Sequence, residues 1–336
     1  MQKPLKDNNN KVMFNSEYLR ELSDKAIANL GFTPEAEKLF APVRYIMALG
    51  GKRLRPVMCL LACNLFKDKI DEALMPAVGI EVFHNFTLIH DDIIDKAGLR
   101  RGSSTVHSKF GTEQAILSGD VMAFVATECI GQAPEKMLAR TLKLFNRTAI
   151  EVCTGQQLDI DYEKKALVSE AEYMRMIELK TAVLVAASLK TGAIIGEASE
   201  KDQDLLYEFG RCLGIAFQIQ DDVLDTYGDA KMFGKKTGSD IVTNKKTYLL
   251  VKALEMAGGA KLRDLRKLIE DKNPDPEEKI RGVRAIYDEL EIQLHAENLA
   301  YEYFNKAFES LDQVSVQAER KKEIKQLAVN LIGRIR

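Results

Sequence analysis

Apolar residues recur at helical spacing along most of the chain, and EYMRMIELKTAVLVAASLKTGAIIG at residues 172–196 is a clear case. No proline falls between Pro134 and Pro274, so the strongest helix breaker is absent from that stretch. The alternation typical of strands is almost absent, and no Asn-Gly or Asp-Gly pair indicates a hairpin. The pattern predicts an all-α fold, a single bundle of about ten or more helices around a central cavity. Five apolar residues of 172–196 can share one broad face: Met174, Ile177, Ala182, Leu184 and Val185.

Turn signals divide this helical pattern. Asn-Pro-Asp-Pro at 273–276 predicts a loop that separates a basic helix from one or two further helices. The first eleven residues, MQKPLKDNNNK, are polar, and we expect residues 1–15 to form a flexible N-terminal tail. We therefore expect one domain over residues 16–336.

Composition excludes several classes of protein. A formal net charge of −2 argues against a global basic field for nucleic acid, so any anion site must be local. The five cysteines are odd in number and form no Cys-x-x-Cys pair, which argues against a disulfide framework or zinc site and favours a reducing compartment. No apolar run reaches the roughly 18–20 residues of a membrane span. These features predict a soluble, cytoplasmic protein.

Two acidic motifs echo one another, DDIID at 91–95 and DDVLD at 221–225, and each follows an apolar run. On a helix Asp91 and Asp95 lie one turn apart on one face, where like charges repel, with Asp92 beside them. Each motif also lies near the expected end of its helix, where the helix dipole disfavours anions. A single motif of this kind is more often a solvated helix end. Two of them favour clustered hard ligands for Mg²⁺ completed by phosphate oxygens.

Basic residues gather in two places. GGKRLRP at 50–56 joins two glycines to Lys52, Arg53 and Arg55, and Arg100 and Arg101 follow the first acidic motif. Glycine lets a backbone approach a ligand closely, and arginine binds phosphate through two hydrogen bonds at once. A solvated turn is the alternative for either cluster alone. Acid clusters for metals together with basic clusters for phosphates predict an enzyme that holds two phosphorylated substrates, one through metal and one directly.

Specific motifs then identify a family resemblance. The marks are GGKRLRP, HDDIID, RRGSSTVH, SGDVM at 118–122, GQQLD at 155–159, LKTA at 179–182, FQIQDDVLD at 217–225 and GKKTGSDI at 234–241. Their order and spacing resemble those of the trans-type isoprenyl diphosphate synthases, or polyprenyl synthetases, from about residue 40 to about residue 250. That family includes farnesyl and geranylgeranyl diphosphate synthases.

The resemblance implies a role for each matching residue. Three Mg²⁺ would hold an allylic diphosphate through Asp91, Asp92, Asp95, Asp221, Asp222 and Asp225. The same diphosphate would contact Arg100, Lys180, Lys235 and Lys245, although Asn244 replaces the usual glycine before Lys245. Isopentenyl diphosphate would lie against Lys52, Arg55, His84 and Arg101. Thr181 and Gln218 match residues that line the carbocation, and the C-terminal Arg334 and Arg336 are weaker candidates for closing over the second diphosphate.

The implied reaction is a condensation. Loss of diphosphate leaves an allylic cation, the double bond of isopentenyl diphosphate attacks it, and a proton passes to the released pyrophosphate. Water must be excluded because it would quench the cation. The partners implied are isopentenyl diphosphate, an allylic diphosphate with dimethylallyl, geranyl or farnesyl chain, and a second copy of the chain in a homodimer.

Product length should depend on the helix before Asp91, because each turn advances about 5.4 Å, close to one isoprene unit. The residues four, five and eight positions before Asp91 are the candidate depth stops: Thr87, Phe86 and Phe83. Only the minus-five position among the first two is aromatic, which resembles a geranylgeranyl-making pattern and favours a C20 product. A C15 product, a longer product and plain core packing of the two phenylalanines remain alternatives. So do a class I terpene cyclase, a non-catalytic partner subunit and a helical scaffold that binds divalent cations.

Overall fold

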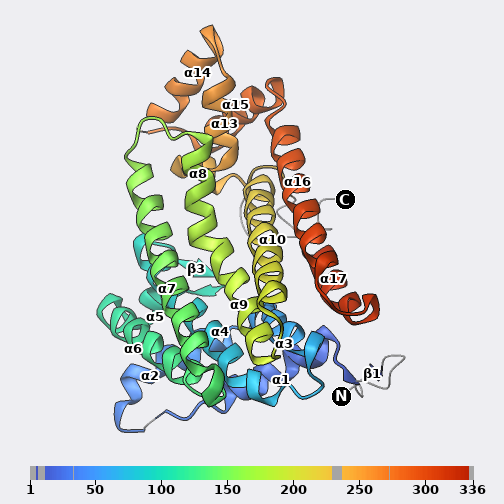
Figure 1. The fold of residues 1–336 in the computed structure, drawn as a ribbon. Coiled ribbons are helices and arrows are strands. Elements are labelled where there is room, and N and C mark those ends of the chain that lie inside the picture. The colour runs from blue at the N-terminus through green and yellow to red at the C-terminus, as the bar shows by residue number, and fades with distance from the viewer. Residues whose placement is uncertain (1–4, 7–11, 33, 229–236, 272, 333–336) are drawn as a thin grey trace. The chain divides into compact units, whose positions relative to one another are not determined.

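The computed structural model describes residues 5–6, 12–32, 34–228, 237–271 and 273–332. Three predicted site residues, Lys235, Arg334 and Arg336, lie outside these ranges. The described chain is almost entirely α-helical, which confirms the predicted fold class (Figure 1). The strands in this part are two short antiparallel pairs: β1 (Leu5–Lys6) with β2 (Val12–Met13), and β3 (Leu99–Arg100) with β4 (Ser103–Ser104).

The chain divides into two compact units. Unit 1 consists of Met1–Thr148, Leu184–Glu208 and Ser310–Val329, and unit 2 consists of Ala149–Val183, Phe209–Glu309 and Asn330–Arg336. The expectation of one domain over residues 16–336 stays a prediction. The first short strand pair forms within residues 1–15, which the sequence suggested are a flexible tail.

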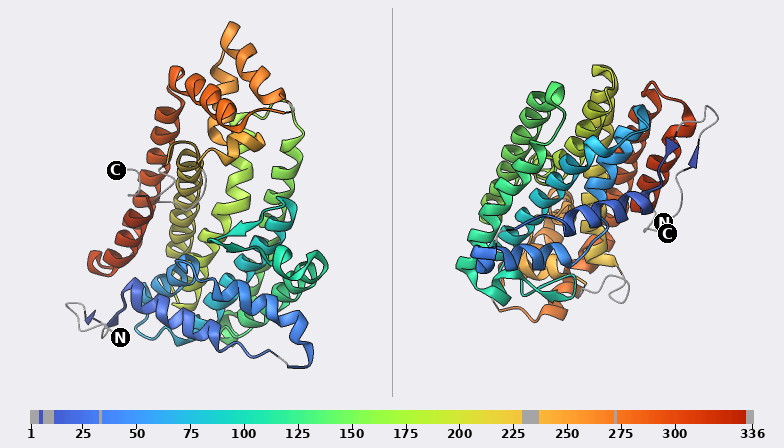
Figure 2. Two further views of the ribbon diagram at one scale, coloured as in Figure 1. Left: turned by 180° about the vertical axis from the view of Figure 1, so that it is seen from behind. Right: turned by 90° about the horizontal axis from the view of Figure 1, so that it is seen from below.

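Unit 1 contains the helices α1 to α6, which come first in the chain. Its elements, besides the strands, are α1 (Ser16–Ala28), η1 (Pro34–Ala36), α2 (Glu37–Ala48), α3 (Leu54–Phe66), α4 (Asp71–Ile94), α5 (Val106–Phe110) and α6 (Thr112–Ile130). Helix α3 is buried on every side from Pro56 to Leu65, as its apolar composition requires. Helix α4 packs against α3 and α6 (Figure 2).

Unit 2 contains α8 (Glu170–Ile177), α12 (Ser239–Thr243), α13 (Tyr248–Met256), α14 (Gly259–Glu270) and α15 (Pro276–Glu289). A π-helical turn, η2 (Glu178–Ala182), follows α8 directly. Five helices have residues in both units: α7 (Glu135–Glu163), α9 (Val183–Ile195), α10 (Glu200–Tyr227), α16 (Ile292–Gln313) and α17 (Ala318–Ile332). The core of unit 2 joins side chains from α8, α10, α13 and α15.

Helix ends follow the sequence signals. Asp275 caps α15 by accepting a hydrogen bond from the backbone N–H of Glu278, and Pro276 occupies the first helical turn. The predicted loop at 273–276 is therefore present, and two helices, α15 and α16, follow it. Ser169 and Glu172 form a capping box at the start of α8. Within the described ranges, no helix is long and apolar enough to cross a bilayer.

Candidate active site

Helix α4 ends at the first acidic motif, as the sequence predicted, with Asp95 as its C-cap. Asp92 is buried and accepts two hydrogen bonds, both of 2.7 Å, from Nε and Nη2 of Arg100 on β3. Such a two-point pair is among the stronger polar contacts in proteins. Asp91 and Asp95 lie nearer the surface than Asp92 does. The motif therefore combines one buried acid with two acids that are more accessible to a ligand.

Basic side chains gather in unit 1 around the loop that precedes α3. Gly50 and Gly51 have φ angles of 73° and 140°, which glycine adopts without strain. Arg101 donates a hydrogen bond to the carbonyl oxygen of Gly50. A Cβ atom at Gly51 would lie only 3.1 Å from the guanidinium carbon of Arg101, so glycine is required for this close approach. The loop thus brings the GGKRLRP motif against the arginine that follows the first acidic motif.

His84, which lies among these basic side chains, is neutral. Burial lowers its pKa well below the ordinary value, and the charges of four arginines lower it further: Arg55, Arg101, Arg100 and Arg53. Burial also lowers the pKa of Arg55 and of Arg101, while the carboxylate of Glu81 partly opposes this for both. The positive charges of four arginines therefore act on the half-buried imidazole of His84. His84 lies about two helical turns before Asp91 on α4. An anion of high charge fits such a place.

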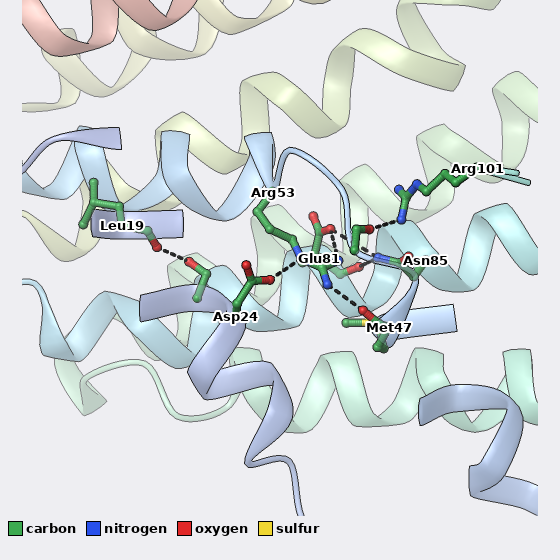
Figure 3. A network of polar contacts seen from close by, with 9 residues as sticks. Leu19, Asp24, Met47, Arg53, Glu81, Asn85 and Arg101 are labelled. Atoms are coloured by element: carbon green, nitrogen blue, oxygen red, sulfur yellow. Dashed lines mark hydrogen bonds and ion pairs between the residues drawn. The ribbon is translucent and has the colours of Figure 1, made fainter. Parts of the chain in front are cut away.

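The predicted isopentenyl diphosphate residues divide by exposure. Lys52 is exposed, whereas Arg55 and His84 are half-buried. The Nε atom of Arg55 is buried and has no hydrogen-bond partner within the described part of the chain. A buried unpartnered donor is costly, so an acceptor from a ligand would relieve it. Arg53, the remaining cation of the motif, is turned away into a buried network (Figure 3).

In unit 2 the predicted catalytic residues Lys180 and Thr181 lie in the π-helical turn η2. A π turn inserts one extra residue and frequently marks a functional site. It explains why Ile177 and Ala182, five residues apart, are both buried. Leu184 and Val185 are buried as well, and Met174 is half-buried, in keeping with the predicted face.

Two glycines hold the π turn closely. A Cβ atom at Gly155 on α7 would lie 2.3 Å from the backbone nitrogen of Lys180. A Cβ atom at Gly214 on α10 would lie 2.6 Å from the Cα atom of Ala182. Neither distance is possible for a real side chain, so both helices approach the turn backbone to backbone. The turn is therefore fixed by packing on α7 and α10.

The side chains of the π turn are also fixed. Lys180 Nζ lies 2.5 Å from Oδ2 of Asp159, a buried residue of α7. Thr181 donates its hydroxyl to Oε1 of Gln218 at 2.9 Å, and Gln218 Nε2 donates to Oδ1 of Asp222 at 3.1 Å. The three predicted residues Lys180, Thr181 and Gln218 thus lie in one region of unit 2.

Asp222 is the buried member of the second acidic motif. Its Oδ2 atom accepts hydrogen bonds from the Tyr173 hydroxyl at 2.5 Å and the backbone N–H of Tyr248 at 2.9 Å. Burial raises its pKa to about 6, although the hydrogen bonds from Tyr173, Tyr248 and Gln218 lower it in part. Asp221 beside it is exposed. The second motif therefore repeats the division seen at Asp91 and Asp92.

The third acid of the motif, Asp225, organises the start of α12. It accepts hydrogen bonds from the Ser239 hydroxyl at 2.6 Å and from the backbone N–H of Asp240 at 3.0 Å. Burial raises the pKa of Asp240 to about 7, and the acids Asp225, Asp222 and Asp221 raise it too, while Lys245 lowers it. Lys245 is thus close enough to this acidic cluster for its charge to act on Asp240.

Asn244 replaces a glycine that the family usually has, and its conformation explains why it is tolerated. Its φ of 57° and ψ of 32° are left-handed, a region that asparagine adopts more readily than most residues. Its Nδ2 atom donates to the carbonyl oxygen of Ile269 at 2.9 Å. The substitution therefore leaves the backbone before Lys245 in a turn that glycine would also permit.

The predicted chain-length residues lie on α4 within unit 1. Phe83 is buried, and its ring packs at 5.4 Å from the rings of both Phe86 and Phe145. Phe86 also packs edge-on against His90 at 4.8 Å. The hydroxyl of Thr87 donates a hydrogen bond of 2.8 Å to the carbonyl oxygen of His84. The rings of Phe83 and Phe86 thus lie about one to two turns before Asp91 on α4, in one continuous cluster with Phe145 and His90.

Sequence reasoning did not assign roles to three of these residues. Asp159 stands in the GQQLD motif, and Asp240 in GKKTGSDI, so the motifs themselves carried a signal for both. Tyr173 carried none, because a tyrosine at a helical core position is ordinary. Each is hydrogen-bonded to a predicted site residue that is distant in the sequence: Tyr173 to Asp222, Asp159 to Lys180, and the backbone of Asp240 to Asp225.

The donor set fits Mg²⁺ held together with a diphosphate. The acids available at the two motifs are hard oxygen ligands, and Mg²⁺ characteristically takes one or two carboxylates plus phosphate oxygens and water. Within the described residues, no three acid, His or Cys side chains gather closely enough to hold a metal by themselves. Phosphate oxygens would therefore have to complete the coordination at either motif.

Comparisons with known proteins identify the family to which the chain is similar. A family model described as polyprenyl synthetase matches residues 36–289. A geranylgeranyl diphosphate synthase of Methanosarcina mazei is 39% identical over 292 residues, covering 86% of this chain and 88% of that relative. A geranylfarnesyl diphosphate synthase of Natronomonas pharaonis is 37% identical over 277 residues, covering 77% and 80%. A crystal structure of a geranylgeranyl pyrophosphate synthase matches with a TM-score of 0.92 at 38% identity, covering 96% of this chain and 99% of that chain.

The chain belongs to the polyprenyl synthetase family. The resemblance inferred from its motifs is confirmed, and the enzyme is a prenyltransferase. Membership of this family decides against the terpene cyclase and the cation-binding scaffold.

Proposed function

We propose that the protein condenses isopentenyl diphosphate with an allylic diphosphate and that its principal product is geranylgeranyl diphosphate. The observation that carries this proposal is the cluster of arginines around neutral His84, on the helix that ends at DDIID. Helix α4 thus carries His84, where a diphosphate would bind without metal, and the DDIID motif, where a diphosphate would bind through metal. A short-chain prenyltransferase requires both.

Isopentenyl diphosphate would be bound without metal by Lys52, Arg55, His84 and Arg101. The arginines offer paired donors to phosphate oxygens, and Lys52 adds a point charge. Neutral His84 can donate one ring N–H to a phosphate oxygen without carrying a proton into the site. These contacts hold the homoallylic double bond in place for attack, which converts an encounter between two substrates into a step between fixed groups.

The allylic diphosphate would meet Asp91 and Asp95 at the end of α4, with Arg100 held in position by Asp92. In unit 2, Asp221 would be the ligand-facing acid, with Asp222 and Asp225 supporting it through their hydrogen bonds. Mg²⁺ bound by these acids, three ions as the family resemblance implies, would neutralise the leaving diphosphate. Lys180, Lys245 and Lys235 would add positive charge to the same group.

The π turn would stabilise positive charge on carbon. The Thr181 hydroxyl and Gln218 amide are fixed by one another at 2.9 Å, so their dipoles need little reorganisation when an allylic cation forms. Carbonyl groups of a π turn are less completely paired than those of a regular helix, and they add to this. A proton then leaves the new chain for the released pyrophosphate, so no side-chain base is needed.

The growing chain would extend along α4 from Asp91 toward Phe86 and Phe83. Phe86 is half-buried five residues before Asp91, and its contact with Phe83 closes the path one further turn down. Thr87 at minus four leaves more room than an aromatic residue would, which favours C20 over C15. The geranylfarnesyl relative keeps a longer product as the second candidate.

We propose that the chain functions as a homodimer in a reducing cytoplasm. None of the five cysteines forms a disulfide, which suits that compartment. Leu117 and Phe124 lie seven residues apart on α6 and are exposed, with 75% of the Phe124 surface accessible. A second copy could cover these side chains across a two-fold axis. Sedimentation of the protein and of Phe124→Asp tests this: the substitution should yield monomers, and an unchanged dimer would place the interface elsewhere.

The catalytic proposal is tested by assaying the purified chain alone with labelled isopentenyl diphosphate, dimethylallyl diphosphate and Mg²⁺. We expect condensation, and we expect Asp91→Ala and Asp221→Ala to lower kcat by orders of magnitude while the far-ultraviolet circular dichroism stays unchanged. Asp264→Ala, an exposed acid of α14, is the control and should be near normal. Activity that appears only after a second type of subunit is added would favour the partner-subunit alternative.

A further inference from the structure

Arg53 lies in the middle of the basic GGKRLRP motif, yet its guanidinium group faces away from the pocket. Only 3% of the residue is exposed. Nε donates to Asp24 on α1 at 2.8 Å, Nη1 donates to Glu81 on α4 at 3.0 Å, and Nη2 donates to the carbonyl oxygen of Met47 at 2.6 Å (Figure 3). All three nitrogens already have acceptors. Arg53 is therefore not available to bind a diphosphate.

The backbone of Arg53 gives a second reason to regard it as special. Its φ of 47° and ψ of 40° are left-handed, which is unfavourable for any residue with a Cβ atom. Glycine would adopt this conformation without strain. A long side chain persists in such a conformation when its contacts determine it. Here the contacts of the guanidinium group fix the turn between exposed Lys52 and the first residue of α3.

Glu81 connects this turn to the helix that carries the predicted pocket. It is almost fully buried on α4, three residues before His84. Asn85 Nδ2 donates to the carbonyl oxygen of Glu81 at 2.8 Å and lies 3.3 Å from its Oε1. The pair Arg53–Glu81 therefore fixes the position of the GGKRLRP turn relative to α4, close to His84.

Electrostatics agree with a structural role for this pair. Although burial lowers the pKa of Arg53, hydrogen bonds and charges from Asp24 and Glu81 outweigh burial and raise it overall. The pKa of Arg55 is lowered instead, and Glu81 only partly compensates. Arg53 is thus neutralised within the protein, while Arg55 retains an unpartnered Nε atom. Of these two arginines of the motif, Arg53 is used for folding, and Arg55 keeps a buried donor that a ligand could accept from.

We propose that Arg53 and Glu81 are positioning residues for isopentenyl diphosphate: their buried pair holds Lys52 and Arg55 of the turn in register with His84. This inference rests on the proposed function, because it deepens the assignment of that pocket. It predicts that loss of the pair weakens isopentenyl diphosphate binding while leaving the allylic diphosphate almost unaffected.

Glu81→Gln distinguishes positioning from simple charge. If Glu81 acted only through its negative charge near a diphosphate, its removal would reduce repulsion and lower the KM for isopentenyl diphosphate. If the pair positions the turn, the same substitution raises that KM. Arg53→Gly is the complementary variant, because glycine accepts the left-handed backbone and only the side-chain contacts are lost.

The experiment measures KM for each substrate, kcat and the melting temperature of the full chain, and titrates isopentenyl diphosphate calorimetrically into the same proteins. We expect KM and Kd for isopentenyl diphosphate to rise about tenfold or more in Glu81→Gln and Arg53→Gly, with KM for the allylic substrate changed less than about twofold. Arg44→Gln, which breaks an exposed ion pair on α2, is the control and should match the wild type.

Three results would overturn the inference: unchanged KM and Kd for isopentenyl diphosphate, tighter binding in Glu81→Gln, or equal rises for both substrates. If Glu81→Gln fails to fold, Glu81→Asp retains the charge and shortens the reach, and it should give a smaller rise in the same constants. Wild-type protein that binds isopentenyl diphosphate but does not condense it would contradict the proposed function alone, because the titration still tests positioning.

Discussion

Lys180 Nζ lies 2.5 Å from Oδ2 of Asp159, and this pair joins the π turn to α7 in unit 2. The carboxylate of Asp159 is buried. Gly155 lies one turn earlier on the same helix, and because it has no side chain, α7 can approach the backbone nitrogen of Lys180 closely. Helix α7 therefore determines both where the backbone of Lys180 lies and where its ammonium group points.

Asp159→Asn should lower kcat roughly 10- to 100-fold, because a neutral amide no longer fixes the ammonium group that is proposed to meet the diphosphate. Steady-state kinetics with saturating isopentenyl diphosphate measure this. Asp161→Asn, two residues further along α7 and exposed, is the matched control and should retain normal kcat. Equal activity in the two variants would remove Asp159 from the account.

Gly155→Ala should disturb the π turn directly, since its Cβ atom would lie 2.3 Å from the backbone nitrogen of Lys180. We expect a loss of about 1–3 kcal/mol in the free energy of unfolding, typical of overpacking, together with lower turnover. Gly31→Ala is the control, because open space surrounds that position. Urea unfolding monitored by circular dichroism makes the comparison, and wild-type stability in Gly155→Ala would show that the helices can move apart at no cost.

Acid should destabilise the protein through His84. Its pKa is lowered in the folded state by burial and by four arginines, so the folded chain resists protonation there. Below pH of about 6.5 the unfolded chain takes up a proton that the folded chain does not, so stability falls as pH falls. Above that pH the group is neutral in both states and contributes no pH dependence.

The test compares unfolding of wild type and His84→Gln between pH of about 5 and 8. The wild type should lose up to about 1.4 kcal/mol more per pH unit on the acid side than the variant does. A slope that is identical in wild type and His84→Gln would contradict a neutral buried His84.

Much of this organisation could be predicted from the chain alone. Helical periodicity and proline spacing predicted the fold class, and like-charge crowding in DDIID and DDVLD pointed to metal and phosphate. The sequence could not show that Arg53 turns inward while Lys52 stays exposed, because that depends on a left-handed backbone. It could not pair Asp159 with Lys180 either, since 21 residues separate them and only tertiary packing joins them. A π turn inserts a single residue, which disturbs the apolar pattern too little to be recognised.

Phe86→Ala should lengthen the product, because the half-buried ring is the first aromatic group below Asp91 on α4. Its contacts with Phe83 and His90 would be lost, and the path along the helix would be open for about one more turn. Mass-resolved product analysis checks this. Phe14→Ala, in the N-terminal segment beside Tyr18, is the control and should leave product length unchanged. Unchanged products from Phe86→Ala would mean that Phe86 is not the floor.

The most direct test of the account is the chain length made by the purified wild-type protein. Labelled isopentenyl diphosphate is supplied with dimethylallyl, geranyl or farnesyl diphosphate in the presence of Mg²⁺, and the products are resolved by mass. The account predicts that all three starters are elongated and that geranylgeranyl diphosphate accumulates from each. Failure to incorporate isopentenyl diphosphate from any starter would contradict the proposed prenyltransferase, and accumulation of C15 or C25 instead would contradict the assigned product.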